Sequence, residues 1–194
     1  MSSMLRNYIN IIALQRVNPI IEPILPWLND KQGKILDFGC GLGHIAFIIS
    51  KKTKRQMTYL DVRKYPYACP GVKIEVFDGK TIPYPNKEFD TTLIIFVLHH
   101  VPNPAASLRE VMRVSSSDII LCEDLVRSKK EMVSEAIKDT VANCFLPHMW
   151  MQYRIESDWE NMFTELGLKI KNKTYFNSRY IFNFNHVAWQ LSVK

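Results

Sequence analysis

Short apolar segments rich in β-branched residues alternate with helical segments along most of this 194-residue chain. The strand-like segments lie at 34–38, 57–61, 72–77, 91–96 and 118–123. Continuous apolar strands that alternate with helices are typical of a parallel sheet covered by helices on both faces. Two more strands are predicted over 169–175 and 186–193, joined by an aromatic, Asn-rich turn. The sequence therefore predicts an α/β fold.

Several predicted helices carry recognisable starts and stops. Asn103 precedes Pro104, and this pair caps and opens a helix. The segments 128–131 and 157–160 both read Ser-x-x-Glu, which is the capping-box pattern. Gly167 follows an apolar series with helical spacing and is expected to end that helix. These signals predict three helices in the second half of the chain.

No linker, internal repeat or low-complexity tract divides the sequence, so we expect one domain over residues 1–194. Residues 1–32 are predicted to form N-terminal helices, because apolar side chains recur there at helical spacing. Within that segment Asn18 offers a cap and Pro19 a helix-opening residue.

Composition excludes several classes of protein. With 47% hydrophobic and 23% charged residues, the chain fits a globular domain and not a disordered or collagen-like one. Its longest apolar run, 93–98, is far shorter than the about 20 residues of a membrane span, and no signal-peptide pattern is visible. The cysteines are scattered without a CxxC pair: Cys40, Cys69, Cys122 and Cys144. We therefore expect a cytoplasmic protein without a metal site or a disulfide framework.

The chain is basic, with 25 Lys and Arg against 19 Asp and Glu and a formal net charge of +6. Such an excess can indicate a polyanionic partner. The densest groups, at 51–55 and 169–173, fit solvated helix ends and strand faces better than a continuous binding strip. Nucleic acid therefore stays open as an alternative partner, and nothing in the pattern indicates an oligomeric state.

A glycine cluster follows the first predicted strand in the sequence DFGCGLG, residues 37–43. Glycines in such a turn let the backbone bend sharply and let a ligand approach the N-terminus of the next helix. A dinucleotide fingerprint needs a glycine where His44 stands, and the loop lacks the GK[ST] ending of a triphosphate-binding loop. Taken alone, the turn is also compatible with simple tight packing.

Four short sequence segments, called stations below, together resemble the motifs of the class I S-adenosylmethionine-dependent methyltransferases. The first is the acid-x-Gly-x-Gly-x-Gly motif at 37–43, and the second is Asp61, which ends the second strand. The third is the pair Asp78–Gly79 after the third strand, and the fourth is FDTTLIIFVLHHV at 89–101. The resemblance is close over about 34–123 and rests on element order elsewhere. It implies a three-layer Rossmann-like sandwich with a mostly parallel seven-stranded sheet, an antiparallel C-terminal strand and S-adenosyl-L-methionine as cofactor.

The resemblance also implies roles for the residues of these stations. Asp61 would accept both ribose hydroxyls of the cofactor, and Asp78 would accept the adenine amino group beside the Gly79 backbone. Asp37 would orient the methionyl amino end. The glycines of the turn and three apolar walls complete the expected cofactor site: Gly39, Gly41, Gly43, Phe38, Val62 and Phe96. The Asp-Gly pair by itself equally fits a simple turn.

Methyl transfer is an in-line displacement that depends mainly on orientation, so a dedicated acid or base is not obligatory. His99 and His100 follow the fourth strand, where an open parallel sheet places its ligands, and either imidazole could take a proton from a hydroxyl acceptor. The alternative is that they cap the following loop or shape the cofactor pocket. Glu123 and Asp124, at the end of the fifth strand, are candidate substrate contacts or else solvent-facing or loop-anchoring residues.

The segment 125–156 departs from a minimal methyltransferase core and is predicted to insert a lid-like helical segment after the fifth strand. Segments at the carboxyl edge of such a sheet commonly carry recognition. The candidate acceptor-site residues are Tyr8, Glu123, His148, Trp150, Tyr153, Arg154 and Arg179. For each of them the alternative is ordinary packing or, for Arg179, exposure at a hairpin tip.

The leading hypothesis is a methyltransferase that acts on a small-molecule acceptor, because the aromatic insertion suggests an enclosed pocket. Methylation of RNA or another polyanion is the second enzymatic hypothesis, favoured by the positive charge. A noncatalytic partner subunit that keeps the cofactor fold is the third. The intact DFGCGLG loop and Asp61 argue against loss of the cofactor.

Overall fold

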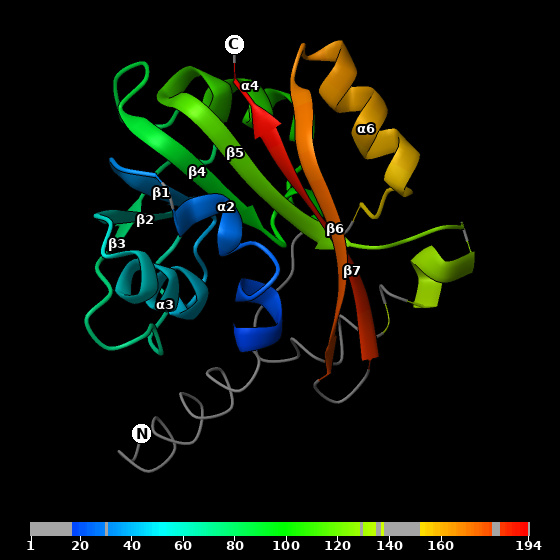
Figure 1. Cartoon of the computed structure of the whole chain (residues 1–194), viewed down its shortest axis with the longest axis horizontal. Helices are drawn as coiled ribbons and strands as arrows, with labels where there is room; N and C mark the ends of the chain where they lie inside the picture. The colour runs from blue at the N-terminus through cyan, green and yellow to red at the C-terminus, as the bar shows by residue number, and fades with distance from the viewer. Residues whose placement is uncertain are drawn as a thin grey trace.

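The computed structural model describes residues 17–29, 31–128, 130–134, 137, 152–179 and 183–193. Its seven strands form one sheet in the order β3-β2-β1-β4-β5-β7-β6 (Figure 1). The strands are β1 Ile35–Phe38, β2 Met57–Asp61, β3 Ile74–Val76, β4 Phe89–Ile95, β5 Ser115–Asp124, β6 Lys169–Arg179 and β7 Asn183–Ser192. Strands β1 to β5 are parallel, whereas β7 pairs antiparallel with both β5 and β6. The expected seven-stranded mixed sheet is confirmed.

The C-terminal hairpin is longer than the sequence predicts. Strand β6 runs to Arg179 and β7 begins at Asn183, where the pattern ends one strand at 175 and begins the next at 186. Asn177 pairs with Asn185 in the extended part. Asparagine has a poor intrinsic strand propensity, so cross-strand pairing and not local preference sets this length.

Helices cover both faces of the sheet, as Figure 1 shows. Residues 17–21, α2 (Pro26–Asn29) and α3 (His44–Thr53) pack on one face through a buried cluster that includes Ile21, Leu28 and Ile49. On the other face α4 (Pro104–Val114) and α6 (Glu156–Glu165) contribute Leu108 and Trp159 to a second buried cluster. The expected three-layer arrangement is therefore confirmed. Among the described residues, no helix has the length and apolar character that crossing a membrane requires.

Two of the three predicted N-terminal caps in the second half of the chain form, and the third does not. Asn103 caps α4, because its Oδ1 accepts the Ala106 N–H at 3.0 Å. Ser128 Oγ likewise accepts the Glu131 N–H at 3.2 Å. The capping box predicted at 157–160 is wrong: the N-cap of α6 is Ile155, two residues before Ser157, and no side chain caps the helix. Glu160 is not available for that role because its carboxylate binds strands β6 and β7.

Those contacts of Glu160 join α6 to the C-terminal hairpin. Its Oε1 accepts the Lys173 Nζ at 2.8 Å and the Trp189 Nε1–H at 3.0 Å. Trp189 is 0% exposed, so its indole N–H needs an acceptor. The hydrogen bond that the buried Trp189 indole needs thus takes precedence over the local capping pattern.

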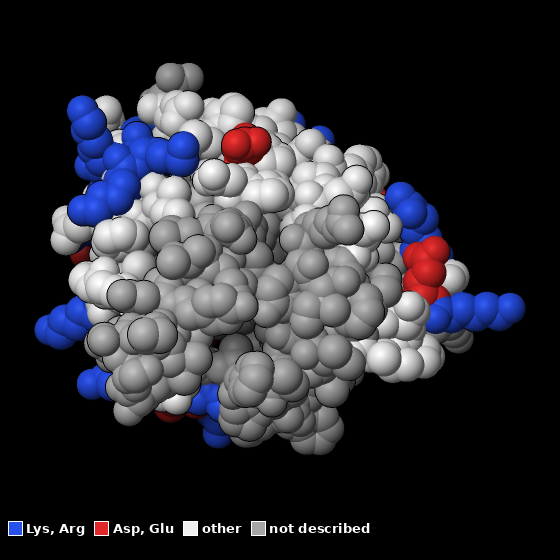
Figure 2. Space-filling view, turned by 90° about the horizontal axis from the view of Figure 1, so that it is seen from below, with Lys and Arg blue, Asp and Glu red and all other residues white. Residues whose placement is uncertain are grey.

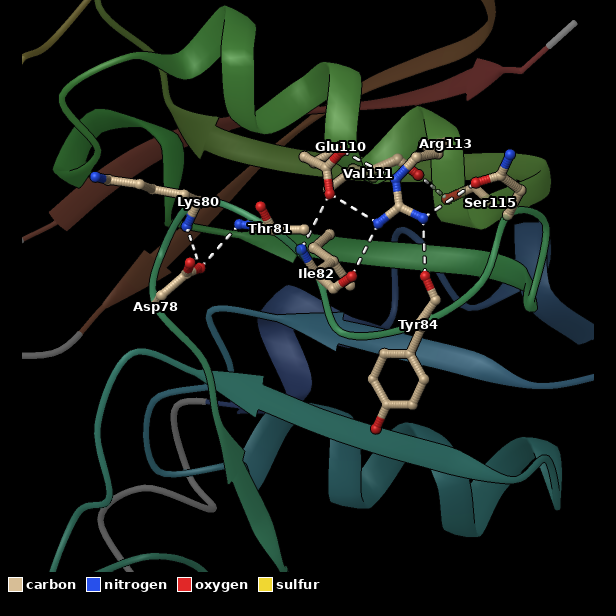
Figure 3. Close-up of polar contacts among 10 residues, drawn as sticks. Asp78, Lys80, Thr81, Ile82, Tyr84, Glu110, Val111, Arg113 and Ser115 are labelled. Atoms are coloured by element: carbon tan, nitrogen blue, oxygen red, sulfur yellow. Dashed lines mark hydrogen bonds and ion pairs between the residues drawn. The ribbon is translucent and has the colours of Figure 1, made fainter.

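Arg113, near the end of α4, holds the loop between β3 and β4 (Figure 3). Its Nη2 and Nη1 donate to the carbonyl oxygens of Ile82 and Tyr84, each at 2.8 Å. Glu110 pairs with Arg113 and accepts the Ile82 N–H at 3.0 Å. The same loop contains Asp78 and Gly79, the third of the four sequence stations, a few residues before these contacts.

Replacing Arg113 by alanine is expected to destabilise the fold by about 1–3 kcal/mol, the scale for hydrogen bonds that involve a charged group. Arg109→Ala is the matched control, because Arg109 is exposed on the same helix. Denaturant unfolding of both variants measures the difference. Equal stability of the two variants would contradict the anchoring role of Arg113.

Candidate active site

The glycine loop between β1 and α3 contains three glycines with left-handed backbone angles: φ is 72° at Gly39, 55° at Gly41 and 77° at Gly43. A Cβ at Gly39 would lie 2.6 Å from Cγ1 of Val97, and one at Gly43 would lie 2.8 Å from Cγ1 of Val72. A Cβ at Gly41 would have no neighbour within 4 Å. Packing of the protein itself therefore excludes side chains at the outer two glycines, whereas the space over Gly41 is open.

Asp61 connects β2 to this loop. Its Oδ2 accepts the Gly41 N–H at 2.8 Å, and the backbone amides of Val62 and Arg63 also donate to its carboxylate. Burial raises the pKa of Asp61, and the three amide hydrogen bonds oppose that rise. The carboxylate thus lies at the mouth between β1 and β2, directly against the open glycine.

Asp37, on β1, is a second buried carboxyl group at this edge and is 5% exposed. Burial raises the pKa of Asp37 to about 8, and the charge of Asp61 adds to the rise. Two acidic groups in one desolvated place repel each other when ionised. A cationic ligand would relieve this repulsion, so the donor set here fits a positively charged molecule.

Asp78 and Gly79 form a turn after β3. The Asp78 Oδ1 accepts the N–H groups of Lys80 and Thr81, both at 2.8 Å (Figure 3), and these bonds lower the pKa of the carboxyl group. Gly79 has φ 77°, and a Cβ there would lie 3.1 Å from Cγ1 of Val62. Val62 is 55% exposed beside this turn. The turn at Asp78 and Gly79 therefore lies next to the end of β2, beside the exposed side chain of Val62.

The two predicted aromatic walls differ in their surroundings. Phe38 is buried in the core and its ring lies 5.7 Å from that of Phe77. Phe96 is half-buried, follows β4 and has the unusual φ of 58°. Its backbone N–H donates to the Cys122 carbonyl at 2.9 Å, and its ring lies 4.7 Å from the imidazole of His186. Phe96 therefore reaches toward β7 at the carboxyl edge.

His99 lies in the single turn η1 (Leu98–His100) and is 2% exposed. Its Nδ1 pairs with a carboxylate oxygen of Glu123, whose other oxygen accepts the Leu98 N–H at 2.8 Å. The imidazole stacks on Tyr153 at 5.2 Å and contacts the ring of His100 at 4.0 Å. This arrangement favours the loop-capping interpretation of His99 and makes Glu123 its anchor.

A second acid–histidine pair lies on the other side of β5. His186 Nδ1 is 2.9 Å from Oδ1 of Asp124, and its Nε2 is 2.6 Å from the Ser178 hydroxyl. Sequence reasoning missed this cluster, because its members lie on three strands and no local motif marks them. The solvent-facing interpretation of Glu123 and Asp124 is wrong, since they are 1% and 8% exposed. Consecutive strand residues point to opposite faces, so each acid meets its own histidine.

The remaining candidate residues are only partly described. Arg154 is half-buried and its guanidinium lies 5.7 Å from the ring of Trp159. The backbone of Arg179 ends β6, and its side chain lies outside the described residues, as do Tyr8, His148 and Trp150. Within the predicted insertion, residues 130–134 are helical, and Val133 is 62% exposed.

Basic side chains do not form a continuous strip among the described residues in the view of Figure 2. Lys and Arg stand there in separate groups around the edge of the view. The scattered arrangement matches the dispersed lysines and arginines of the sequence. In this view it gives no support to an extended polyanion-binding surface among those residues.

Comparisons with known proteins find similar sequences. A family model described as a methyltransferase domain matches residues 9–172. The uncharacterized protein MJ1452 of Methanocaldococcus jannaschii is 27% identical in an alignment of 197 positions, which covers 84% of this chain and 73% of that protein. Ajmaline N-methyltransferase of Rauvolfia serpentina is 26% identical over 140 residues, which cover 60% of this chain and 48% of the relative.

A solved structure shares the fold along nearly the whole chain. The SAM-dependent methyltransferase of Aquifex aeolicus superposes with a TM-score of 0.67 at 16% identity, covering 93% of this chain and 92% of the other.

Proposed function

This chain belongs to the class I S-adenosylmethionine-dependent methyltransferases, and we propose that it methylates a small-molecule acceptor. The observation that supports this acceptor class is the concentration of aromatic rings where β7 pairs with the carboxyl end of β5. Phe96, Phe176 and Phe184 surround His186, with ring centroids 4.7, 5.0 and 6.1 Å from the imidazole. Apolar walls with a few polar groups are typical of sites for small ligands. The similarity to an ajmaline N-methyltransferase is consistent with this class.

The residues present fit the cofactor. S-adenosylmethionine carries an electrophilic methyl group on a positively charged sulfur. The open space over Gly41 suits its approach to the backbone, and the buried carboxyl groups of Asp37 and Asp61 suit a cationic molecule. We assign the methionyl amino group to Asp37 and the ribose hydroxyls to Asp61.

The adenine end is assigned to the turn after β3. Asp78 would accept the adenine amino group through carboxylate capacity beyond its two amide bonds, with Gly79 close by. Val62 and Phe96 would form the apolar walls, and Phe38 would support them from the core. Orientation of the two reactants in a dry site then supplies much of the rate enhancement.

The acceptor side is assigned to residues that follow β4 and β5. Backbone contact between these segments is direct, because the Gln152 N–H donates to the His99 carbonyl at 2.7 Å. His99 and Glu123 thereby hold the segment that contains Tyr153 and Arg154, while half-buried His100 remains a candidate to meet the acceptor. The predicted lid segment 125–156 would select the acceptor from this side.

Asp61→Ala is expected to weaken S-adenosylmethionine binding by about 1–3 kcal/mol, because hydrogen bonds to a charged acceptor are lost. Isothermal titration calorimetry with the methyl donor and with its demethylated product measures the change. Glu88→Ala, which removes a partly exposed acid paired with Lys34 away from the loop, is the control. Unchanged affinity of the Asp61 variant would move the ribose contact elsewhere.

The acceptor class is tested by incubating the protein with cell extract and methyl-labelled S-adenosylmethionine. Label in the small-molecule fraction is the expected result. Label in RNA or in protein would overturn the proposed acceptor class and leave the enzyme class intact. Binding of the cofactor without any transfer would favour a noncatalytic partner subunit.

A further inference from the structure

We propose that Ser178, His186 and Asp124 form a proton relay that removes the proton of a hydroxyl acceptor. The Ser178 hydroxyl would contact the acceptor, and His186 and Asp124 would act through it. This inference rests on the proposed function and narrows its acceptor to compounds that are methylated on oxygen. The relay lies on β5, β6 and β7, on the opposite side of β5 from the His99–Glu123 pair.

The atoms of the cluster are arranged in series. Ser178 Oγ lies 2.6 Å from His186 Nε2, and Oδ1 of Asp124 lies 2.9 Å from His186 Nδ1. This is the order of hydroxyl, imidazole and carboxylate that activates a serine in hydrolytic enzymes. The carboxylate lies off the line of the ring N–H, so it acts on His186 mainly through its charge.

The pair of His186 and Asp124 is shielded from water. Their side chains are 4% and 7% exposed. Phe176 and Phe184 pack against the imidazole and limit its movement. Ser178 is half-buried, so its hydroxyl is the most accessible part of the cluster.

The relay is connected to the cofactor loop through Phe96. The Phe96 ring contacts His186, and the next residue, Val97, lies where a side chain at Gly39 would clash. The positive φ of Phe96 is costly for an aromatic residue. Backbone strain of this kind concentrates at functional sites. Two adjacent residues after β4 therefore link the proton relay to the turn that holds the methyl donor.

The acceptor class follows from the proton balance. The acceptor O–H proton would move to Ser178 Oγ while the serine proton moves to His186 Nε2. An O–CH₃ bond forms as the S–CH₃ bond of the donor breaks, which leaves a neutral thioether. The proton on His186 then passes to solvent. A neutral amine attacks through its lone pair without prior loss of a proton, so a buried relay of this kind serves a hydroxyl acceptor.

Reactivity of Ser178 tests the relay without knowledge of the acceptor. The full-length protein is treated with diisopropyl fluorophosphate, and adducts are located by mass spectrometry. Attack by Ser178 Oγ forms a P–O bond, releases fluoride and sends the proton to His186. We expect Ser178 to react at least about tenfold faster than the exposed Ser157, and His186→Gln and Asp124→Asn to slow that reaction at least about tenfold. Labelling of Ser178 no faster than Ser157, or unaffected by His186→Gln, would overturn the relay.

Methyl transfer to the labelled extract supplies the second measurement. Ser178→Ala is expected to lower transfer at least about tenfold with cofactor affinity within about twofold, and Ser178→Thr to restore part of it because a hydroxyl returns. Equal transfer by wild type and Ser178→Ala would overturn the relay and leave the methyltransferase assignment intact. Failure of the wild type to bind the cofactor would instead overturn the proposed function, while the labelling experiment still decides the relay. Melting temperatures identify any variant that fails to fold.

Discussion

Replacing Gly41 by valine is expected to lower the affinity for S-adenosylmethionine about a hundredfold, which corresponds to about 2.7 kcal/mol. The branched side chain would occupy the space over the loop, where a Cβ meets no protein atom within 4 Å. It would therefore compete with the ligand and not with the core. The positive φ of 55° adds a backbone cost of about 1–2 kcal/mol to the stability of the variant.

Gly167→Val is the matched control for this substitution. Gly167 has φ 76° after α6, and a Cβ there also meets nothing within 4 Å. Both variants should lose similar stability, and only the Gly41 variant should lose cofactor affinity. Calorimetric titration and thermal unfolding of the two proteins measure both quantities. Equal affinities would show that the glycine turn is not the binding loop.

Asp37→Asn is expected to stabilise the protein at pH 8 and to weaken cofactor binding. The pKa of Asp37 is raised to about 8 in the folded chain, against an ordinary value of 3.8, because burial disfavours the charge. Between these values the folded state holds more protons than the unfolded state, so this group makes stability fall as pH rises. Above about pH 8 the fall stops. Asparagine keeps the size of the group and removes the charge, so the variant lacks this slope.

Melting temperatures of wild type and Asp37→Asn from pH 5 to pH 9 test this expectation. The gain of the variant should grow up to about pH 8, by about 2–4 °C for each kcal/mol in a chain of this size. Affinity for the cationic cofactor should rise with pH over the same range in wild type, because the ionised carboxylate binds the amino group. A pH-independent difference in melting temperature would contradict the buried, proton-holding state of Asp37.

Much of the geometry of the candidate cofactor site was predictable because it is encoded locally. Asp37 and the three glycines lie within seven residues, and the strand before them and helix after them fix their place at the carboxyl edge. Asp61 was equally predictable, because a parallel β1–β2 pair brings the end of β2 beside that turn. The Gly41 N–H bond to Asp61 is the direct result of this register.

The cluster of Ser178, His186 and Asp124 was not predicted. The pattern drew attention to His99 and His100 because they stand side by side after a strand. It gave no weight to His186, which lies in a run of aromatic and asparagine residues and follows Asp124 by 62 positions. The hairpin register, which pairs Asp124 with His186 and Phe176 with His186, brings this cluster together. No local sequence feature of β5, β6 or β7 predicts that pairing.

The sequence by itself determined the layer order and the glycine turn, because hydrophobic period, glycine spacing and capping residues act over a few positions. Only the tertiary structure decided which carboxylate meets which histidine. Glu123 and Asp124 are neighbours in the chain, yet the pleat of β5 sends one to His99 and the other to His186. Likewise the burial of Trp189 drew Glu160 away from its predicted cap. Such contacts depend on the packing of distant elements, where the need to satisfy a buried polar group outweighs local preference.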